Sequence, residues 1–197
     1  MSYSMESSEN LCYDGSSVLI NRLNIHEQEN LDQAEKVITT INATKILSSS
    51  IEIVLTFEYY LSLHKQLFGD IYDWAGTVRN INISKRGTSF VPANQINEVG
   101  QAQFYRLQSL NGFKGLSKKD FVYQIAEFYS DLNILHPFRE GNGRTQRLYF
   151  TLLIRRAGYE LNLLQCDTQQ LMLATIQAAH GVLDYLIDFF YTYIVQK

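Results

Sequence analysis

Cysteine and proline are scarce in this chain of 197 residues. The only cysteines, Cys12 and Cys166, are too few to staple a secreted scaffold with disulfides, and no pair of cysteines and histidines has the spacing of a zinc site. So little cysteine suits a reducing compartment, and we therefore expect a cytoplasmic protein. The only prolines, Pro92 and Pro137, leave room for long uninterrupted helices.

A strong charge bias and a long apolar run are also missing. Seventeen basic and twenty acidic side chains give a net charge of −3, too small for a global field that would attract nucleic acid or an anionic membrane. The most apolar stretch, residues 185–195, contains Asp188 and is much shorter than the roughly 20 residues of a membrane-spanning helix. Residues 1–10 lack the charged and apolar regions of a signal peptide. We expect no membrane association, no direct nucleic-acid binding and no secretion by that route.

Hydrophobic residues, in contrast, make up 46% of the chain, enough for a sizeable core, and the length favours one domain. One segment alternates polar and apolar residues, Asn80-Ile81-Asn82-Ile83, and continues to Val91 through Gly87, which predicts a short β-hairpin at residues 78–91. Elsewhere the apolar spacing predicts helices, so the sequence predicts an all-α fold with one hairpin. The expected helices are residues 26–46, 53–68, 94–110, 117–135, 143–157, 168–179 and 182–195.

The first expected helix has a regular apolar pattern. Steps of three and four residues place five side chains on one face, which we expect to be buried: Leu31, Ala34, Val37, Ile38 and Ile41. Asn24 precedes this helix and is a candidate N-cap. Ser117, with Asp120 three residues later, is a candidate cap for residues 117–135.

The most informative stretch is residues 136–147, His-Pro-Phe-Arg-Glu-Gly-Asn-Gly-Arg-Thr-Gln-Arg, where one expected helix ends and another begins. Gly141 and Gly143 flank an asparagine, so the backbone can turn tightly and leave its N–H groups uncovered. The positive dipole end of the next helix points at the same place. Arg144 and Arg147, three residues apart, can both reach a phosphate. The pattern predicts an anion cradle.

Two other side chains of this stretch suit catalysis. His136, at the rim of the cradle, can take a proton from an attacking hydroxyl. Glu140 is the only acid in the stretch and can bind the magnesium ion that accompanies polyphosphates. A base, a metal ligand, an anion cradle and two cations together indicate transfer of a phosphorus-containing group. His26 and His64 lie in or near expected helices, and we expect both to be structural.

Residue for residue, 136–147 matches the signature HPFx(D/E)GNGRxxR and so resembles the Fic family. Residues 63–76 are similar to the stretch before the family's hairpin, and residues 21–25 to the N-terminal entry of short bacterial toxin-type members. The resemblance covers about residues 20–190. It implies one Fic domain over residues 1–197, a helical bundle with an N-terminal tail at about 1–20, a flap at about 78–91 and the motif at 136–147.

The resemblance implies a protein adenylyltransferase that uses ATP and Mg²⁺ to transfer AMP to a Ser, Thr or Tyr hydroxyl of a target protein. His136 would be the base and Glu140 the magnesium ligand, with Phe138 anchoring the loop in the core. Phosphate binding would fall to the anion hole of Gly141, Asn142 and Gly143 and to the arginines Arg144 and Arg147. The flap would dock the target by strand addition. The docking residues would be Ile81, Ile83, Phe90 and Val91.

Other functions stay open within and beyond this family. In the related Doc toxins, kinase-like transfer accompanies a replaced second glycine, and Gly143 argues against it. Further members transfer UMP, GMP or phosphocholine. A nucleotide-binding interaction module without turnover is a third hypothesis, although the intact motif gives no sign of decay.

Partners also follow from the resemblance. The family is commonly restrained by a helix with the motif (S/T)xxxE(G/N), whose glutamate pairs with the position of Arg147. This chain lacks the motif, because Met5 stands four residues before Glu9 and Ser7 follows Glu6. We therefore expect a toxin with a separate small antitoxin that supplies the helix. Similar short members modify type II DNA topoisomerases such as gyrase, the first candidate target, and filamentation or growth arrest would follow.

Overall fold

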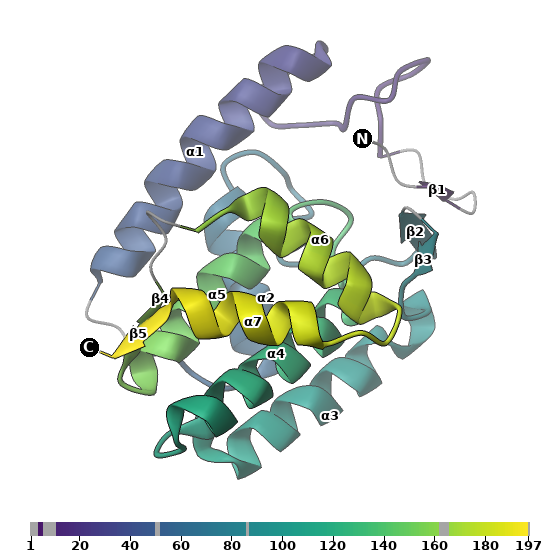
Figure 1. Ribbon diagram of the computed structural model, residues 1–197. Coiled ribbons are helices and arrows are strands. Elements are labelled where there is room, and N and C mark those ends of the chain that lie inside the picture. Colours follow the sequence, from purple (N-terminus) through teal and green to yellow (C-terminus); the bar gives the residue numbers. More distant parts are fainter. Residues whose placement is uncertain (1–3, 6–10, 50–51, 86, 162–165, 197) are drawn as a thin grey trace.

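A computed structural model of the protein describes residues 4–5, 11–49, 52–85, 87–161 and 166–196. Figure 1 shows a mostly helical molecule with two small sheets. The elements in chain order are β1 (Ser4–Met5), α1 (Gln28–Ser48), α2 (Phe57–Phe68), β2 (Ile83–Lys85), β3 (Thr88–Ser89), η1 (Ala93–Gln95), α3 (Ile96–Ser109), η2 (Asn111–Phe113), α4 (Lys118–Leu135), α5 (Asn142–Arg156), β4 (Tyr159–Leu161), α6 (Thr168–Ala179), α7 (Asp184–Tyr193) and β5 (Ile194–Gln196). The predicted all-α fold with a short hairpin is confirmed.

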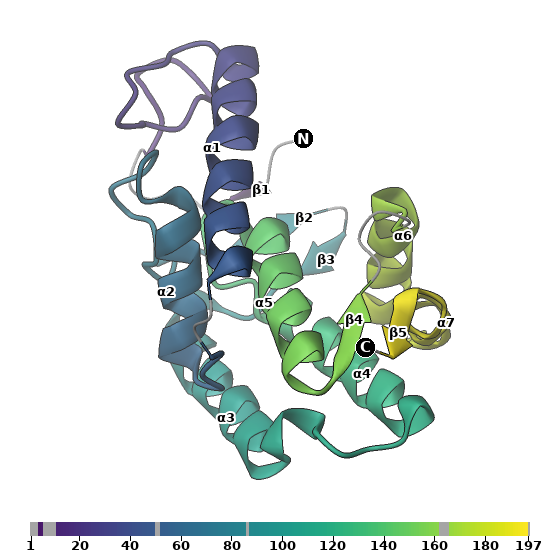
Figure 2. The same cartoon turned by 90° about the vertical axis from the view of Figure 1, so that its left-hand side faces the viewer.

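Helix α5 lies in the middle of the bundle and packs against α2 and α4 (Figure 2). On one side α1 packs against α2, and on the other α6 and α7 pack against each other and against α4. Helix α3 covers α2 and α4 at a further side. The start of α5 therefore lies between α1 and α6, next to the β2–β3 hairpin.

Aromatic side chains fix α5 in this position. Tyr149 and Phe150 of α5 are both fully buried. The Tyr149 ring lies edge-on to Tyr60 of α2 and to Phe104 of α3, with ring centroids 5.4 and 5.5 Å apart. Burial of an apolar ring such as that of Phe150 stabilises the fold by roughly 1.5–3 kcal/mol, and Tyr149 contributes less because its buried hydroxyl has no hydrogen-bond partner among the described residues. The core thus holds the helix whose first turn carries the predicted anion cradle.

Helix boundaries follow the local capping chemistry. The Ser117 hydroxyl accepts from the Asp120 N–H at 3.2 Å, which confirms Ser117 as the N-cap of α4. Helix α6 spans the predicted residues 168–179, because the Asp167 carboxylate caps its first N–H groups. Helix α2 begins later than predicted, since Thr56 caps it and residues 53–55 are not helical.

The predicted face of the first helix is wrong in part. Val37 and Ile41 are 58% and 49% exposed, whereas α1 buries Leu31 together with Glu35, Thr39 and Asn42. The buried polar groups have partners, which is what makes such a face stable: Asn42 Nδ2, for example, donates to the Leu67 carbonyl and to Asp70. Asn24 is not the cap either, because Glu27 occupies that position.

The predicted hairpin is present but short. Strands β2 and β3 pair antiparallel, and β1 adds to the other edge of β2, with Ser4 opposite Ser84 and Met5 opposite Ile83. The predicted C-terminal helix ends at Tyr193, since Ile194–Gln196 pairs with β4. Within the described ranges, every helix is too short or too polar to cross a membrane.

Candidate active site

The loop between α4 and α5 is held in a tight conformation by its own residues. His136 ends α4 with left-handed backbone angles, φ 41° and ψ 61°. The Asn142 side chain accepts from the Phe138 N–H at 2.9 Å and donates to the Phe138 carbonyl at 2.7 Å. At Gly141 φ is 81°, and a Cβ there would lie 2.5 Å from the Phe68 ring, so glycine alone fits. Phe138 itself is fully buried, as an anchor should be.

His136 is arranged as a neutral base. Its Nδ1 lies 3.0 Å from the Asn133 carbonyl, which can only accept, so Nδ1 carries the proton and Nε2 the lone pair. The Phe90 ring stacks on the imidazole, with centroids 3.8 Å apart. Burial lowers the pKa of His136 to about 3, helped by the positive charges of Lys85 and Arg79 and opposed by the bond to Asn133. The ring is therefore uncharged near neutral pH.

The start of α5 offers backbone donors. Thr145 is the first residue whose N–H bonds back, to the Gly141 carbonyl at 3.0 Å. The N–H groups of Asn142, Gly143 and Arg144 precede it and have no accepting group within the helix. The Gly141 N–H donates to the Glu140 carboxylate at 2.9 Å. The cradle is thus open at residues 142–144, while the amide of Gly141 is satisfied.

A cleft of about 550 Å³ brings these groups together. Its floor contains His136, Glu140, Gly141, Gly143, Arg144 and Arg147. The hairpin contributes Lys85, Thr88 and Phe90 to the wall, and α6 contributes a largely apolar wall of Leu171, Met172, Ile176 and Ala179. Asn142 is 3% exposed and serves the loop through its side chain rather than the cleft. One end of the cleft therefore suits phosphates and the other an apolar ring system.

The expected docking residues of the flap do not all face this cleft. Ile81 and Ile83 are 6% and 5% exposed and belong to the buried set. Val91 bonds to the body of the protein through its N–H, which donates to the Ile134 carbonyl at 3.0 Å. Phe90 alone of the four lines the cleft. The apolar side chains of the flap mainly hold it on the bundle, and strand β2 of the flap is paired with β1 on one edge and with β3 on the other.

This combination of fold, flap and helix N-terminus matches a known family, since the sequence model of the Fic/DOC family covers residues 54–154. The chain belongs to this family. An Escherichia coli K12 protein named "Probable protein adenylyltransferase Fic" is 37% identical over 150 residues, which cover 76% of this chain and 74% of that protein. A Sinorhizobium fredii protein named "Probable protein adenylyltransferase y4lH" is 36% identical over 172 residues, which cover 87% and 88%.

Solved Fic domains have the same architecture. The N-terminal Fic domain of a VirB-translocated Bep effector protein from Bartonella quintana, solved with bound ADP, is similar with a TM-score of 0.89 and 25% identity over 95% of each chain. These findings confirm the predicted family and Fic fold, and the relatives carry the expected enzyme class, protein adenylyltransferase, in their names.

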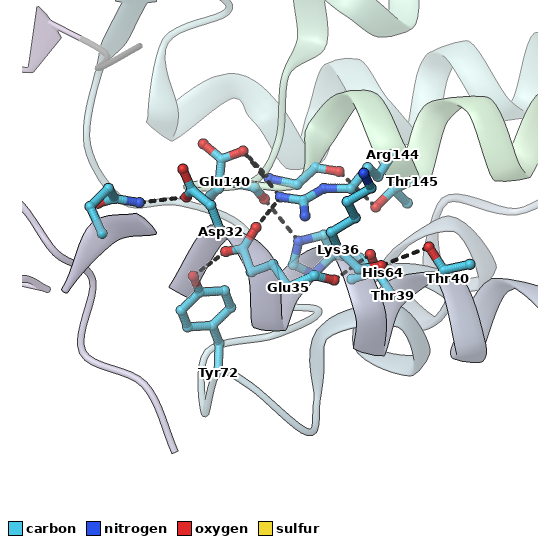
Figure 3. Close-up of polar contacts among 12 residues, drawn as sticks. Asp32, Glu35, Lys36, Thr39, Thr40, His64, Tyr72, Glu140, Arg144 and Thr145 are labelled. Atoms are coloured by element: carbon cyan, nitrogen blue, oxygen red, sulfur yellow. Dashed lines mark hydrogen bonds and ion pairs between the residues drawn. The ribbon is translucent and has the colours of Figure 1, made fainter. Parts of the chain in front are cut away.

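The two arginines of the Fic motif differ in their surroundings. Arg144 forms an ion pair with Glu35 of α1 and lies 3.6 Å from Glu140 (Figure 3). Its guanidinium also covers the Phe68 ring at 4.6 Å. Arg147 also lines the cleft, but no carboxylate among the described residues lies within ion-pair distance of it. Arg147 therefore lines the cleft without a carboxylate partner among the described residues, whereas Arg144 is paired with the protein's own carboxylates.

Four supporting residues were not among the predicted site residues. His64 accepts from the Gly76 N–H at 2.8 Å and donates to the Glu140 carbonyl at 3.0 Å. Both partners are backbone groups, which agrees with the predicted structural role of His64. Arg79 donates to the carbonyls of His136, Ile81 and Val91 and so ties the flap to the base. Glu35 and Tyr72 are bonded to each other beside Arg144. A polar stripe at helical spacing, Glu35, Thr39 and Asn42, is the one sequence signal that points to α1.

Glu140 suits a magnesium ion held jointly with a polyphosphate. Within the described ranges, no group of three or more His, Cys, Asp or Glu residues could hold a metal by itself. Magnesium usually keeps several waters and binds through one or two carboxylates plus phosphate oxygens, and a single carboxylate in a cleft with a phosphate cradle fits that donor set.

Proposed function

We propose that this Fic protein transfers AMP from ATP to a Ser, Thr or Tyr hydroxyl of a target protein. The observation that carries the proposal is the neutral His136, whose Nε2 holds the lone pair beside the open N-terminus of α5. A base that is uncharged near neutral pH can take the hydroxyl proton as the oxygen attacks. The relatives named adenylyltransferases and the ADP bound to a similar Fic domain support the choice of nucleotide.

The positions of the residues in the cleft support the following roles. The target oxygen forms a bond to the α-phosphorus, the bond to the β-phosphate oxygen breaks, and its electron pair leaves with pyrophosphate while His136 keeps the proton. The N–H groups at the start of α5 and the Arg147 guanidinium would stabilise the phosphate charges. Glu140 would hold Mg²⁺, which supplies charge neutralisation to the phosphates when bound. The apolar wall of α6 would receive the adenosine end.

The target would dock by adding a strand to the flap. Strand β1 supports this, because a segment far away in the sequence already pairs with β2 as an extra strand. A target strand would take the place of β1 beside β2, through backbone hydrogen bonds, and would present its hydroxyl to His136. A type II DNA topoisomerase such as gyrase remains the first candidate. A cytoplasmic site of action is part of the proposal, and the cysteines Cys12 and Cys166, which form no disulfide, suit it.

A toxin role with a separate antitoxin is also part of the proposal. A second cleft of about 400 Å³ lies between α1, α5 and α6 and contains Arg147, Thr39 and Leu171. A helix seated there could bring a glutamate to Arg147 and so block phosphate binding. Glu9 and Asn10 lie outside the described residues. The test is a neighbouring short reading frame with the motif (S/T)xxxE(G/N), whose co-expression must relieve growth arrest, and failure of relief rejects the antitoxin.

Differentially labelled ATP tests the activity. The protein is incubated with Mg²⁺ and host lysate, with ATP labelled at the α-phosphate in one sample and at the γ-phosphate in another. Protein labelled from the α position alone supports AMP transfer. Label from the γ position alone means a kinase, and no label from either means a binding module. His136→Ala should reduce transfer by about 10²–10⁴-fold while nucleotide binding persists, because it removes only the base.

A further inference from the structure

Glu35 of α1 lies outside the Fic motif yet touches it. Its side chain is 8% exposed, and its two oxygens have different partners: one accepts from the Tyr72 hydroxyl and the other meets Arg144 Nη2 (Figure 3). Burial and the nearby Glu35 carboxylate raise the pKa of Tyr72, so the hydroxyl stays protonated and remains a donor. Tyr72 thus fixes one oxygen of Glu35 and leaves the other for the arginine.

Arg144 Nη2 stands between two carboxylates. It is closer to Glu35 than to Glu140, whose Oε1 lies 3.6 Å away. That same Oε1 accepts from the Gly141 N–H. An arginine paired only with Glu140 would compete with any cation for this carboxylate, because a guanidinium and a divalent ion bind the same oxygens.

We propose that Glu35 is a positioning residue that holds Arg144 back from Glu140 and so keeps the Glu140 carboxylate available to Mg²⁺. The inference rests on the proposed function for the metal at Glu140, but it concerns metal affinity and not the transfer step. Glu35 satisfies the charge of Arg144, so a cation that binds Glu140 need not leave the arginine without a carboxylate. Buried partners that orient a metal ligand usually change metal affinity by about 10–100-fold when they are removed.

The chain offers a matched control on the same helix. Asp32 lies three residues before Glu35 and lines the same polar cavity of about 570 Å³, which also contains Glu140 and Arg144. It is exposed, and its carboxylate accepts from Gln28 Nε2 at 2.7 Å. Asp32→Asn removes the same charge as Glu35→Gln without touching Arg144, so it measures the general effect of charge near the site.

The test is ADP binding by calorimetry over a series of Mg²⁺ concentrations, with the full chain. We expect Glu35→Gln to raise the half-saturating Mg²⁺ concentration about tenfold. ADP binding without Mg²⁺ should persist. Glu35→Asp keeps the charge, so its half-saturating Mg²⁺ concentration should stay within about threefold of that of the wild type. Tyr72→Phe removes the bond that orients Glu35 and should raise this concentration by about threefold. Asp32→Asn should leave it unchanged.

A double variant shows whether Glu35 acts through Arg144. In an Arg144→Gln background, Glu35→Gln should cause no further change in the Mg²⁺ requirement, because the competing cation is gone. An unchanged Mg²⁺ requirement in Glu35→Gln with only a lower melting temperature would overturn the proposal, and so would an equal shift in Asp32→Asn. If the ADP affinity of the wild type does not change with the Mg²⁺ concentration, both this inference and the metal role of Glu140 are overturned. If the wild type transfers no AMP but the variants still change the half-saturating Mg²⁺ concentration as expected, only the proposed reaction is rejected.

Discussion

The α4–α5 junction has two faces, which differ in whether their polar groups are bonded within the protein. On the face toward α1 they bond to one another: Glu35 to Tyr72 and Arg144, and His64 to the Glu140 carbonyl. On the face toward α6, Arg147 and the first N–H groups of α5 open into the cleft. The polar groups on the α1 face have protein partners, although they line a polar cavity, whereas the groups on the α6 face open into the cleft without such partners among the described residues.

The difference shows how the protein prepares a ligand site without weakening its fold. Donors that await a ligand are favourable only when the backbone carrying them is held firmly, because a loose loop would turn them to water or to each other. The satisfied face supplies that rigidity, through the ring of His64 stacked on Phe138 at 3.8 Å and the Asn142 bonds to the loop. Substitutions on the two faces should therefore separate stability from binding.

The largest difference between an effect on stability and an effect on binding is expected at the two glycines of the motif, Gly141 and Gly143. Gly141→Ala requires a methyl group 2.5 Å from the buried Phe68 ring at a φ of +81°. Left-handed strain of about 1–2 kcal/mol and overpacking of about 1–3 kcal/mol should lower the free energy of unfolding by roughly 2–5 kcal/mol. At Gly143 the methyl group would meet only Arg147 Nη1, at 3.4 Å. Gly143→Ala should change stability by less than about 1 kcal/mol and weaken ADP binding.

Urea unfolding and calorimetric ADP titration of both variants measure this contrast. The comparison fails if Gly143→Ala destabilises the fold as much as Gly141→Ala does, because the α6 face would then be part of the core.

The two arginines should give an intermediate effect of the same kind. Arg147→Ala removes a cation from the cleft and should weaken binding of a non-hydrolysable ATP analogue by about 10–100-fold, the value of a charge-assisted hydrogen bond of roughly 1.5–3 kcal/mol. Its free energy of unfolding should stay near that of the wild type. Arg144→Ala leaves the buried Glu35 without its cation and should lower stability by about 1–3 kcal/mol.

The same two measurements, unfolding and nucleotide titration, check the arginines. Arg144→Ala could instead be as stable as the wild type and bind nucleotide as weakly as Arg147→Ala. Both arginines would then belong to the binding face, and the structural role given to Arg144 would be wrong.

The residues that the sequence singles out come together at one cleft because their spacing is local. His136, the glycines and the arginines lie within residues 136–147, and their spacing alone brings them to one helix N-terminus. The caps that position this stretch are local too, as at Ser117.

The supporting face depends on contacts that spacing does not reveal. Glu35 is buried only because Tyr72 and Arg144, from distant parts of the chain, meet it, so the apolar pattern of the first helix pointed instead to Val37 and Ile41. The short strands β1, β4 and β5 were missed for the same reason, since two or three residues form a strand only where a partner edge exists. The hairpin was found from its alternation, but the inward direction of Ile81 and Ile83 was not.

The smallest effect we expect concerns pH, because each face holds one buried histidine. Burial lowers the pKa of His136 to about 3 and that of His64 to about 4, against an ordinary value of 6.5. Well above pH 6.5 neither ring carries an appreciable proton in the folded or the unfolded chain, so neither affects stability there. As pH falls from 6.5 towards 4, the unfolded chain takes up these protons first. The free energy of unfolding should then fall by at most about 1.4 kcal/mol per pH unit for each histidine.

His136→Asn removes one of these titrating groups and keeps a residue that tolerates the left-handed backbone. The decline in unfolding free energy, measured by urea at about pH 6 and at about pH 4.5, should become shallower by about 1 kcal/mol per pH unit. His26→Asn makes the same chemical change at an exposed ring and serves as the control. A slope in His136→Asn equal to that of the wild type would mean that the folded protein protonates His136 as readily as the unfolded chain does. The ring would then be charged below about pH 6.5, and the claim that burial lowers the pKa of His136 would fail, while the interpretation of His64 as a buried structural residue would be unaffected.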